Sequence, residues 1–155
     1  MLFRSADLSG TYLSRADLSG ANLWRAKGYR PEHCSALAAL PYMTGPIQAF
    51  KMVNAEGEGY VNGGIKYPVG GVVTDPNANT DPHTQYAAGL NVADLPWVLR
   101  NWVESYRILL VEFTAKDIAA IPHETDGKFR LHRLTVVKDI TDDLRANGVL
   151  PAIKK

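Results

Sequence analysis

A five-residue periodicity governs the first thirty residues of the chain. Read in fives, the segment runs MLFRS, ADLSG, TYLSR, ADLSG, ANLWR and AKGYR, and the first position after Met1 is always small. A helix of period 3.6 would scatter the third positions around its surface, and a strand of period 2 would turn alternate ones to the opposite face. The repeat therefore excludes both as the regular structure of this segment. Its apolar third positions are Phe3, Leu8, Leu13, Leu18 and Leu23.

The units ADLSG, ADLSG and ANLWR resemble the A-(D/N)-L-x-x unit of the pentapeptide-repeat family. The resemblance implies a right-handed quadrilateral parallel β-helix, in which four units make one square turn and the central Leu or Phe points inward. The first residue of each unit is small because neighbouring turns lie about 4.8 Å apart, the strand spacing of a sheet. We therefore expect residues 1–30 to form about one turn, with the five apolar third positions as its core.

One turn of a solenoid is too short to bury its own faces. We expect it to pack on the remainder of the chain, on another copy or on a partner, as a structural cap or an oligomerisation edge. Some members of the family imitate duplex DNA with a long acidic surface. Residues 1–45 carry five basic and three acidic side chains, a net of about +2, so the DNA-mimic function is excluded.

The remaining sequence predicts a connector with a short helix over 31–46 and a compact mixed α+β domain over 47–155, on which the repeat packs. Asp94 is predicted to cap a helix that extends to about residue 105, and a second helix is predicted over 139–146. A polar loop is predicted over 75–85. The predicted strands cover 47–53, 65–67, 72–73, 87–93, 106–113 and 128–137, the last as one long strand.

Three segments of this second part carry a further resemblance. KMVNAEGEGYVNGGIKYPVG, GLNVADLPWVLRNW and DGKFRLHR are similar to a domain of phage and prophage proteins, across about residues 50–140. That domain has no known function and often follows pentapeptide repeats. The resemblance implies a viral or prophage origin and transfers no catalytic residue.

Composition excludes several classes of protein. One cysteine among 155 residues forms no internal disulfide and no cysteine-based zinc site. No apolar run reaches the roughly 18–20 residues of a membrane span, and the N-terminal residues do not read as a signal peptide. We expect a protein of the host cytoplasm or of a virion, with no membrane contact. A net charge of +1 without a basic stripe disfavours nucleic acid as a partner.

No metal or other cofactor is expected. The four histidines lack the spacing of a metal site. The oxygen-bearing residues at every second position from Asp75 to Asp81 resemble the start of a calcium loop, but Thr80 and Tyr86 stand where Gly and Glu are required. We interpret the segment as an ordinary polar loop. No nucleotide, nucleophile or paired-acid motif is present, so no catalytic residue is assigned.

A row of basic residues is the candidate ligand site. Lys128, Arg130 and His132 fall on one face of the predicted strand by period two. The row could bind a phosphate or a carboxylate, together with Arg107 and Lys66. It could equally be the solvent face of an antiparallel strand.

Three tryptophans are candidate interface anchors. Trp97 and Trp102 are five residues apart and so do not share one line of their helix, and Trp24 stands at an outward position of the repeat. An exposed tryptophan is a strong anchor for a partner. A role in the hydrophobic core is the alternative for each of them.

Three functions fit these features. The first is a non-enzymatic phage or prophage protein that acts by protein–protein contacts, in host interaction or anti-defence, with a protein partner or a second copy of itself. The second is a structural component of a virus particle or another large assembly. The third is a small-molecule or nucleotide binder, or an ADP-ribosyltransferase-like domain, that uses Arg107, Arg130 and His132.

Overall fold

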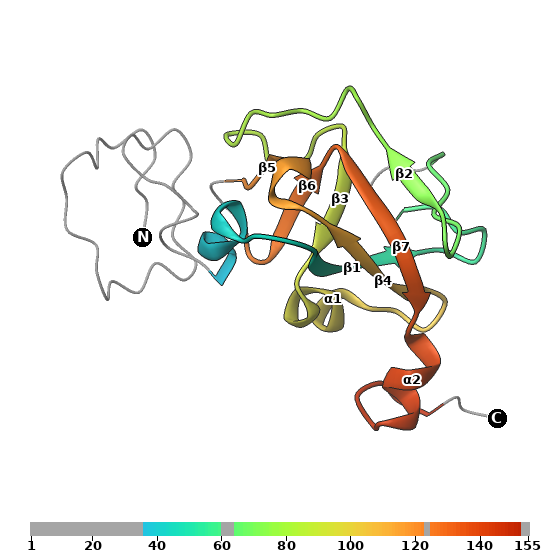
Figure 1. Ribbon diagram of the computed structural model, residues 1–155. Helices are drawn as coiled ribbons and strands as arrows, with labels where there is room; N and C mark the ends of the chain where they lie inside the picture. Colours follow the sequence, from blue (N-terminus) through green and yellow to red (C-terminus); the bar gives the residue numbers. More distant parts are fainter. Residues whose placement is uncertain (1–35, 60–63, 123–124, 153–155) are drawn as a thin grey trace.

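The structure is a computed structural model, and it describes residues 36–59, 64–122 and 125–152 (Figure 1). The predictions for the repeat lie outside these residues: the β-helix, its five core positions and Trp24. The described part has a mixed α+β fold with a seven-stranded antiparallel sheet. Its elements in chain order are the 3₁₀ helix η2 (Ala36–Tyr42), β1 (Ile47–Val53), β2 (Val72–Thr74), β3 (Leu90–Ala93), α1 (Leu95–Asn101), β4 (Arg107–Phe113), the 3₁₀ helix η3 (Ala115–Asp117), β5 (Ile118–Ala120), β6 (Lys128–Leu131), β7 (Arg133–Asp139) and α2 (Thr141–Ala146).

The strands follow the order β2-β7-β4-β1-β3-β6-β5. β1 lies at the centre and pairs with β4 along its whole length, from Ile47 opposite Phe113 to Val53 opposite Arg107. Strand 47–53 is confirmed to the residue, and β4 begins one residue later than predicted. Of the predicted strand 65–67 the structure keeps one bridge, between Glu58 and Lys66. Residues 118–120, where no strand was predicted, form the edge strand β5.

The prediction of one long strand over 128–137 is wrong, because the chain bends at His132 (Figure 1). β6 pairs with β3 and β5, whereas β7 pairs with β2 and β4, so the two strands lie on opposite sides of β1. The bend also shifts the alternation by one residue. Phe129 and Leu131 are buried before it, and Leu134 and Val136 are buried after it.

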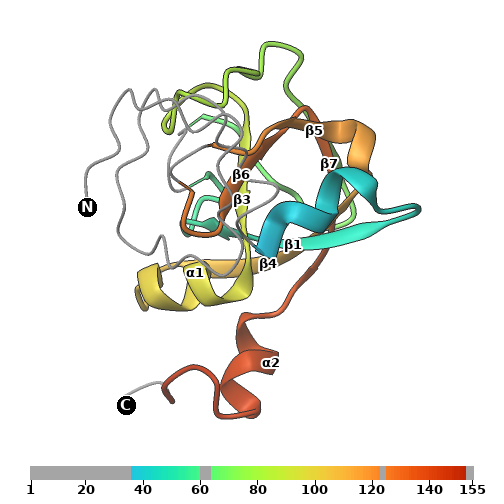
Figure 2. The same cartoon turned by 90° about the vertical axis from the view of Figure 1, so that its left-hand side faces the viewer.

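The sheet buries side chains on both faces. The larger core cluster lies on the face of β1 that carries Ile47 and Val53, here called the inner face. It includes the rings of Phe113 and Phe129, which are tilted by 55° with centroids 5.5 Å apart. A smaller cluster on the outer face joins Met52 and Ile108 to α1 and α2. In both views α1 lies against the sheet and α2 lies below it, farther from the sheet (Figures 1 and 2). Burial on both faces agrees with the unbroken apolar run of β4.

Helix α1 begins where the sequence predicts. The Asp94 carboxylate accepts a hydrogen bond from the Trp97 backbone N–H at 2.7 Å, so it caps the helix. The helix ends at Asn101, four residues earlier than predicted, and the Trp102 indole then donates to the Tyr106 carbonyl at 2.8 Å. No helix in the described ranges is long and apolar enough to cross a membrane.

Candidate binding site at Lys128

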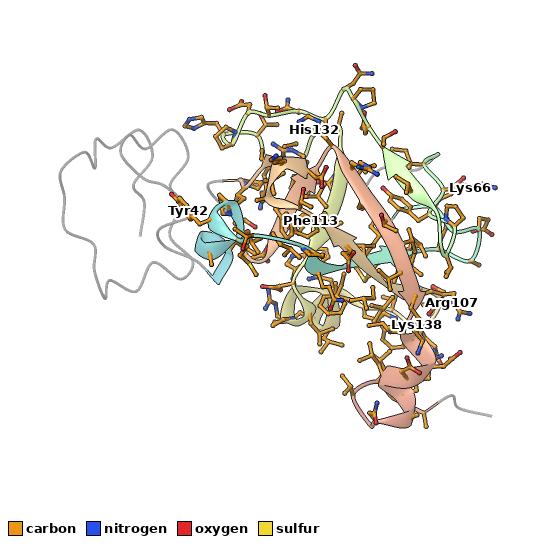
Figure 3. All side chains as sticks on the ribbon, in the orientation of Figure 1. Tyr42, Lys66, Arg107, Phe113, His132 and Lys138 are labelled. Carbon is orange, nitrogen blue, oxygen red and sulfur yellow. The ribbon has the colours of Figure 1, made fainter. Side chains whose placement is uncertain are left out.

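The structure does not bring the five candidate cations together. Figure 3 shows Lys66, Arg107 and His132 well apart, with His132 at the opposite end of β7 from Arg107. Lys128 and Arg130 do share the outer face of β6, as period two predicts, but their exposed fractions are 8% and 0%. The solvent-face alternative is therefore wrong for these two residues. The reason is that α1 and the loop before β3 cover this part of the sheet.

Arg130 holds that loop in place. Its Nε donates to the Asn79 carbonyl at 3.0 Å, its Nη2 to the Asp81 carbonyl at 2.7 Å, and its Nη1 to the Thr84 carbonyl at 2.6 Å. Burial lowers the pKa of Arg130 from its ordinary value, although Asp81 nearby opposes this. All three guanidinium nitrogens thus serve the chain's own backbone. Arg130 has a structural role in this fold and is not free for a ligand.

The side-chain oxygens at every second position of the loop over 75–85 also stabilise the loop itself. Asp75 Oδ1 accepts from the Asn77 N–H at 3.0 Å, and Asn79 Oδ1 accepts from the Asp81 N–H at 2.7 Å. Asp81 Oδ1 accepts in turn from the His83 N–H at 2.9 Å, and these hydrogen bonds lower the pKa of Asp81. A side chain that binds the backbone two residues ahead mimics a turn. Consecutive turns of this kind explain the period of two without a metal ion.

Arg107 is also occupied. Its Nε donates to Asp139 Oδ2, and its Nη2 lies 3.7 Å from the carboxylate of Asp142. Hydrogen bonding to Asp139 raises the pKa of Arg107. Burial alone would raise the pKa of Asp139, but hydrogen bonds from Arg107 and Thr141 outweigh it and lower that pKa. The pair joins β4 to the start of α2.

The two remaining candidates lie apart from any shared site. Lys66 is exposed at its isolated bridge with Glu58. His132 occupies the bend, where its backbone N–H donates to the Asp117 carbonyl at 2.7 Å and its ring Nδ1 lies 3.4 Å from the Asp75 carbonyl.

Lys128 differs from the other cations, because its ammonium meets aromatic rings. The nitrogen lies 4.1 Å from the ring centroid of Tyr86 and 5.2 Å from that of Trp97. Among the described residues, no carboxylate or hydrogen-bond acceptor pairs with it. The ammonium is therefore held by cation–π contacts, and Lys128 also lines a small recess with mostly apolar walls. The recess is lined by Phe50, Lys51, Met52, Asn91, Val92, Ala93, Trp97, Val98 and Lys128.

A row of apolar side chains leads from this recess across the outer face. Phe50 stands opposite Leu110 on one side and opposite Ala93 on the other, and Ala93 stands opposite Lys128. On β7 Lys138 stands opposite Leu110, and the register shift beside this pair leaves Val137, which is 42% exposed, without a cross-strand partner on β4. We call Val137, Leu110, Phe50 and Ala93 the outer stripe. Lys128 stands at its end.

A second buried lysine was missed by the sequence analysis. The Lys51 ammonium donates to the Asn91 carbonyl at 2.7 Å and lies 4.7 Å from the ring centroid of Tyr67. Burial lowers its pKa from 10.5 to about 7 and, with a smaller effect of Asp75, raises the pKa of Tyr67. The signal was available, since period two places Lys51 in phase with the inward residues of β1.

The tryptophans take different positions. Trp97 is buried in the outer-face cluster as well as at the Lys128 recess, and Trp102 is half-buried against the same cluster. Tyr86 was not predicted as a site residue, and its exposed ring is recognised only through its contact with Lys128. Within the described ranges no group of three or more His, Cys, Asp or Glu side chains could hold a metal ion.

Comparison with known proteins identifies the first segment. Residues 2–27 match the family model of pentapeptide repeats (8 copies). The match covers the periodic units from which the repeat was predicted. No curated protein and no solved structure matches the chain. The resemblance to a phage and prophage domain over residues 50–140 has no support from these comparisons.

Proposed function

We propose that the chain is a non-enzymatic binding protein that acts by protein–protein contacts. The outer stripe is the observation that carries this proposal. Helices α1 and α2 cover part of the outer face, and the outer stripe extends from this covered part to an exposed side chain. Here Leu110 and Phe50 are half-buried, and Val137 is exposed. Contiguous exposed apolar surface marks sites of interaction with other proteins.

The edge next to the stripe offers a second kind of contact. Val72 of the edge strand β2 is 53% exposed and stands opposite Thr135, two residues from Val137. The other side of β2 forms the free edge of the sheet. An extended segment of a partner can add to such an edge through backbone hydrogen bonds. The setting in a phage or prophage rests on the sequence resemblance, and the repeat at residues 2–27 adds a segment that needs a neighbour.

The ADP-ribosyltransferase-like alternative requires Arg107, Arg130 and His132 to face one ligand. Arg130 binds loop carbonyls and Arg107 pairs with Asp139. His132 lies far from Arg107 (Figure 3). The three side chains therefore do not converge on one ligand.

Replacement of Val137 by Asp tests the proposal. Val149→Asp is the matched control, because Val149 is 46% exposed and lies on the segment after α2, not on a strand of the sheet. Each tagged variant is expressed in the cells that naturally make the protein, and bound proteins are quantified after purification. A charge at the centre of an interface is expected to reduce recovery of the partner at least about ten-fold for Val137→Asp. Equal recovery with both variants, or a monomer that recovers no partner, would contradict the proposal.

A further inference from the structure

We propose that the recess at Lys128 binds a carboxylate that a partner polypeptide presents beside apolar residues. This inference rests on the proposed function and gives the partner its chemistry. The side chain that selects the ligand is Lys128, whose exposed fraction is 8%. The aromatic faces of Tyr86 and Trp97 fix its position.

The charge of Lys128 favours an anion. Removal of an ammonium from water costs free energy unless an opposite charge or hydrogen bonds compensate. Two rings supply part of this compensation, because the face of an aromatic ring is electrically negative. They accept none of the three N–H donors in the strong geometry that an oxygen offers. A carboxylate at the open side of the ammonium completes the compensation with a charge-assisted hydrogen bond.

The size of the recess selects a small group. The volume of the recess is about 20 Å³. One water needs roughly 10–15 Å³, so the recess admits about one water-sized group, such as a carboxylate oxygen, and excludes a whole cofactor. The remainder of the ligand must lie outside, across the neighbouring surface.

The neighbouring surface is the outer stripe. Phe50 and Ala93 line the recess and also belong to the stripe, so a bound chain passes from the cation directly onto apolar side chains. Apolar residues next to an acidic residue match this order of surfaces. The acidic group fixes the register of the partner, and the apolar contact adds most of the binding free energy. The ligand is therefore an Asp, Glu or chain-terminal carboxylate flanked by residues such as Leu.

Two peptides and one small acid test the inference. The probes are acetyl-Leu-Glu-Leu-amide, the same peptide with Gln for Glu, and acetate, each titrated by calorimetry into the full chain. A charge-assisted hydrogen bond predicts that the Glu peptide binds about ten-fold more tightly than the Gln peptide. Acetate alone is expected to bind far more weakly than the Glu peptide. Acetate binding as tight as that of the peptide would instead assign the recess to a free small acid and overturn the polypeptide part.

Variants of the lysine locate the effect. Lys128→Met is expected to abolish the preference for Glu over Gln, and Lys128→Arg to keep part of it if the Met variant does not fold. Lys116→Met is the control, because Lys116 is exposed on η3. Equal binding of the two peptides, no binding of either, or a preference that survives in Lys128→Met would overturn the inference. A failed peptide titration beside a successful Val137→Asp test would refute the carboxylate and leave the protein-contact function standing.

Discussion

At the scale of single residues, the sheet contains two buried lysines, Lys51 and Lys128. Lys51 lies on the inner face of the central strand, where its ammonium donates to one carbonyl and faces the Tyr67 ring. Gly59 makes room for it, because a Cβ there would stand 2.9 Å from the Lys51 nitrogen. Burial of this group makes the stability of the protein depend on pH.

The direction of that dependence follows from the lowered pKa. Between about pH 7, the folded value, and 10.5, the ordinary value, the unfolded chain binds the Lys51 proton more strongly than the folded protein does. The free energy of unfolding therefore rises with pH across this window and is lowest below it. Lys51→Met is expected to flatten the rise and to stabilise the protein near pH 7 by on the order of a few kcal/mol.

Urea unfolding of the parent and of Lys51→Met at several pH values within that window measures this effect. Lys66→Met serves as the control, because Lys66 is exposed and is expected to leave the pH dependence unchanged. A parent protein whose stability does not rise with pH, or a Lys51→Met variant that retains the full rise, would refute the burial of a charged lysine.

At the scale of elements, the N-cap of α1 and the hydrogen bonds of Arg130 stabilise the local structure. Gly127 has a φ of +132°, and a Cβ at that position would stand 2.6 Å from the Asp94 carboxylate that caps α1. Gly148, with a φ of +72°, would place its Cβ in open space. The backbone strain of an alanine is larger at Gly127, because +72° lies near the left-handed helical region and +132° lies far from it, and only Gly127 adds the displaced cap.

Replacement of each glycine by alanine separates strain from capping. Gly148→Ala is expected to cost roughly 1 kcal/mol from strain alone. Gly127→Ala is expected to cost at least about 1 kcal/mol more, because it adds the loss of the N-cap to a larger backbone strain. The free energies of unfolding of both variants and of Asp94→Ala provide the comparison. Equal losses in the two glycine variants would show that the Asp94 contact does not stabilise α1.

The hydrogen bonds of Arg130 fix residues 79–85 through their carbonyls. Arg130→Met is expected to cost roughly 2–4 kcal/mol, because it leaves several carbonyls without a donor. Amide hydrogen exchange in 79–88 is expected to increase more than exchange in β1. Arg107→Met, which removes a half-exposed ion pair, is the control and is expected to cost about 1 kcal/mol or less. Unchanged exchange in the loop of Arg130→Met would contradict this role of Arg130.

At the scale of the whole molecule, local signals were sufficient for parts of the fold and insufficient for the site. The bounds of β1, the Asp94 cap and the polar loop over 75–85 depend on neighbours within a few residues, and the sequence predicted them. The bend at His132 depends on sheet pairings with β3 and β4, which lie far away in the chain. The predicted single strand failed for that reason.

The candidate site likewise combines features that local sequence predicts with features that depend on distant residues. Period two correctly placed Lys128 and Arg130 on one face of β6, but their burial depends on a loop some 46 to 51 residues earlier in the chain. Tyr86 reaches Lys128 only because Arg130 fixes that loop. The outer stripe likewise combines single residues from β3, β1, β4 and β7, and it exists only once the strand register is known.

The central claim is that a partner protein contacts the outer face of this sheet at the stripe. Site-specific photo-crosslinking tests it most directly, with a benzophenone amino acid at position 137 or, as the matched control, at position 149. Val137 and Val149 have similar exposed fractions, 42% and 46%, so the two probes have similar access to solvent. A crosslink to a partner or a second copy is expected from position 137, and none is expected from position 149. A crosslink from position 149 alone would contradict the central claim.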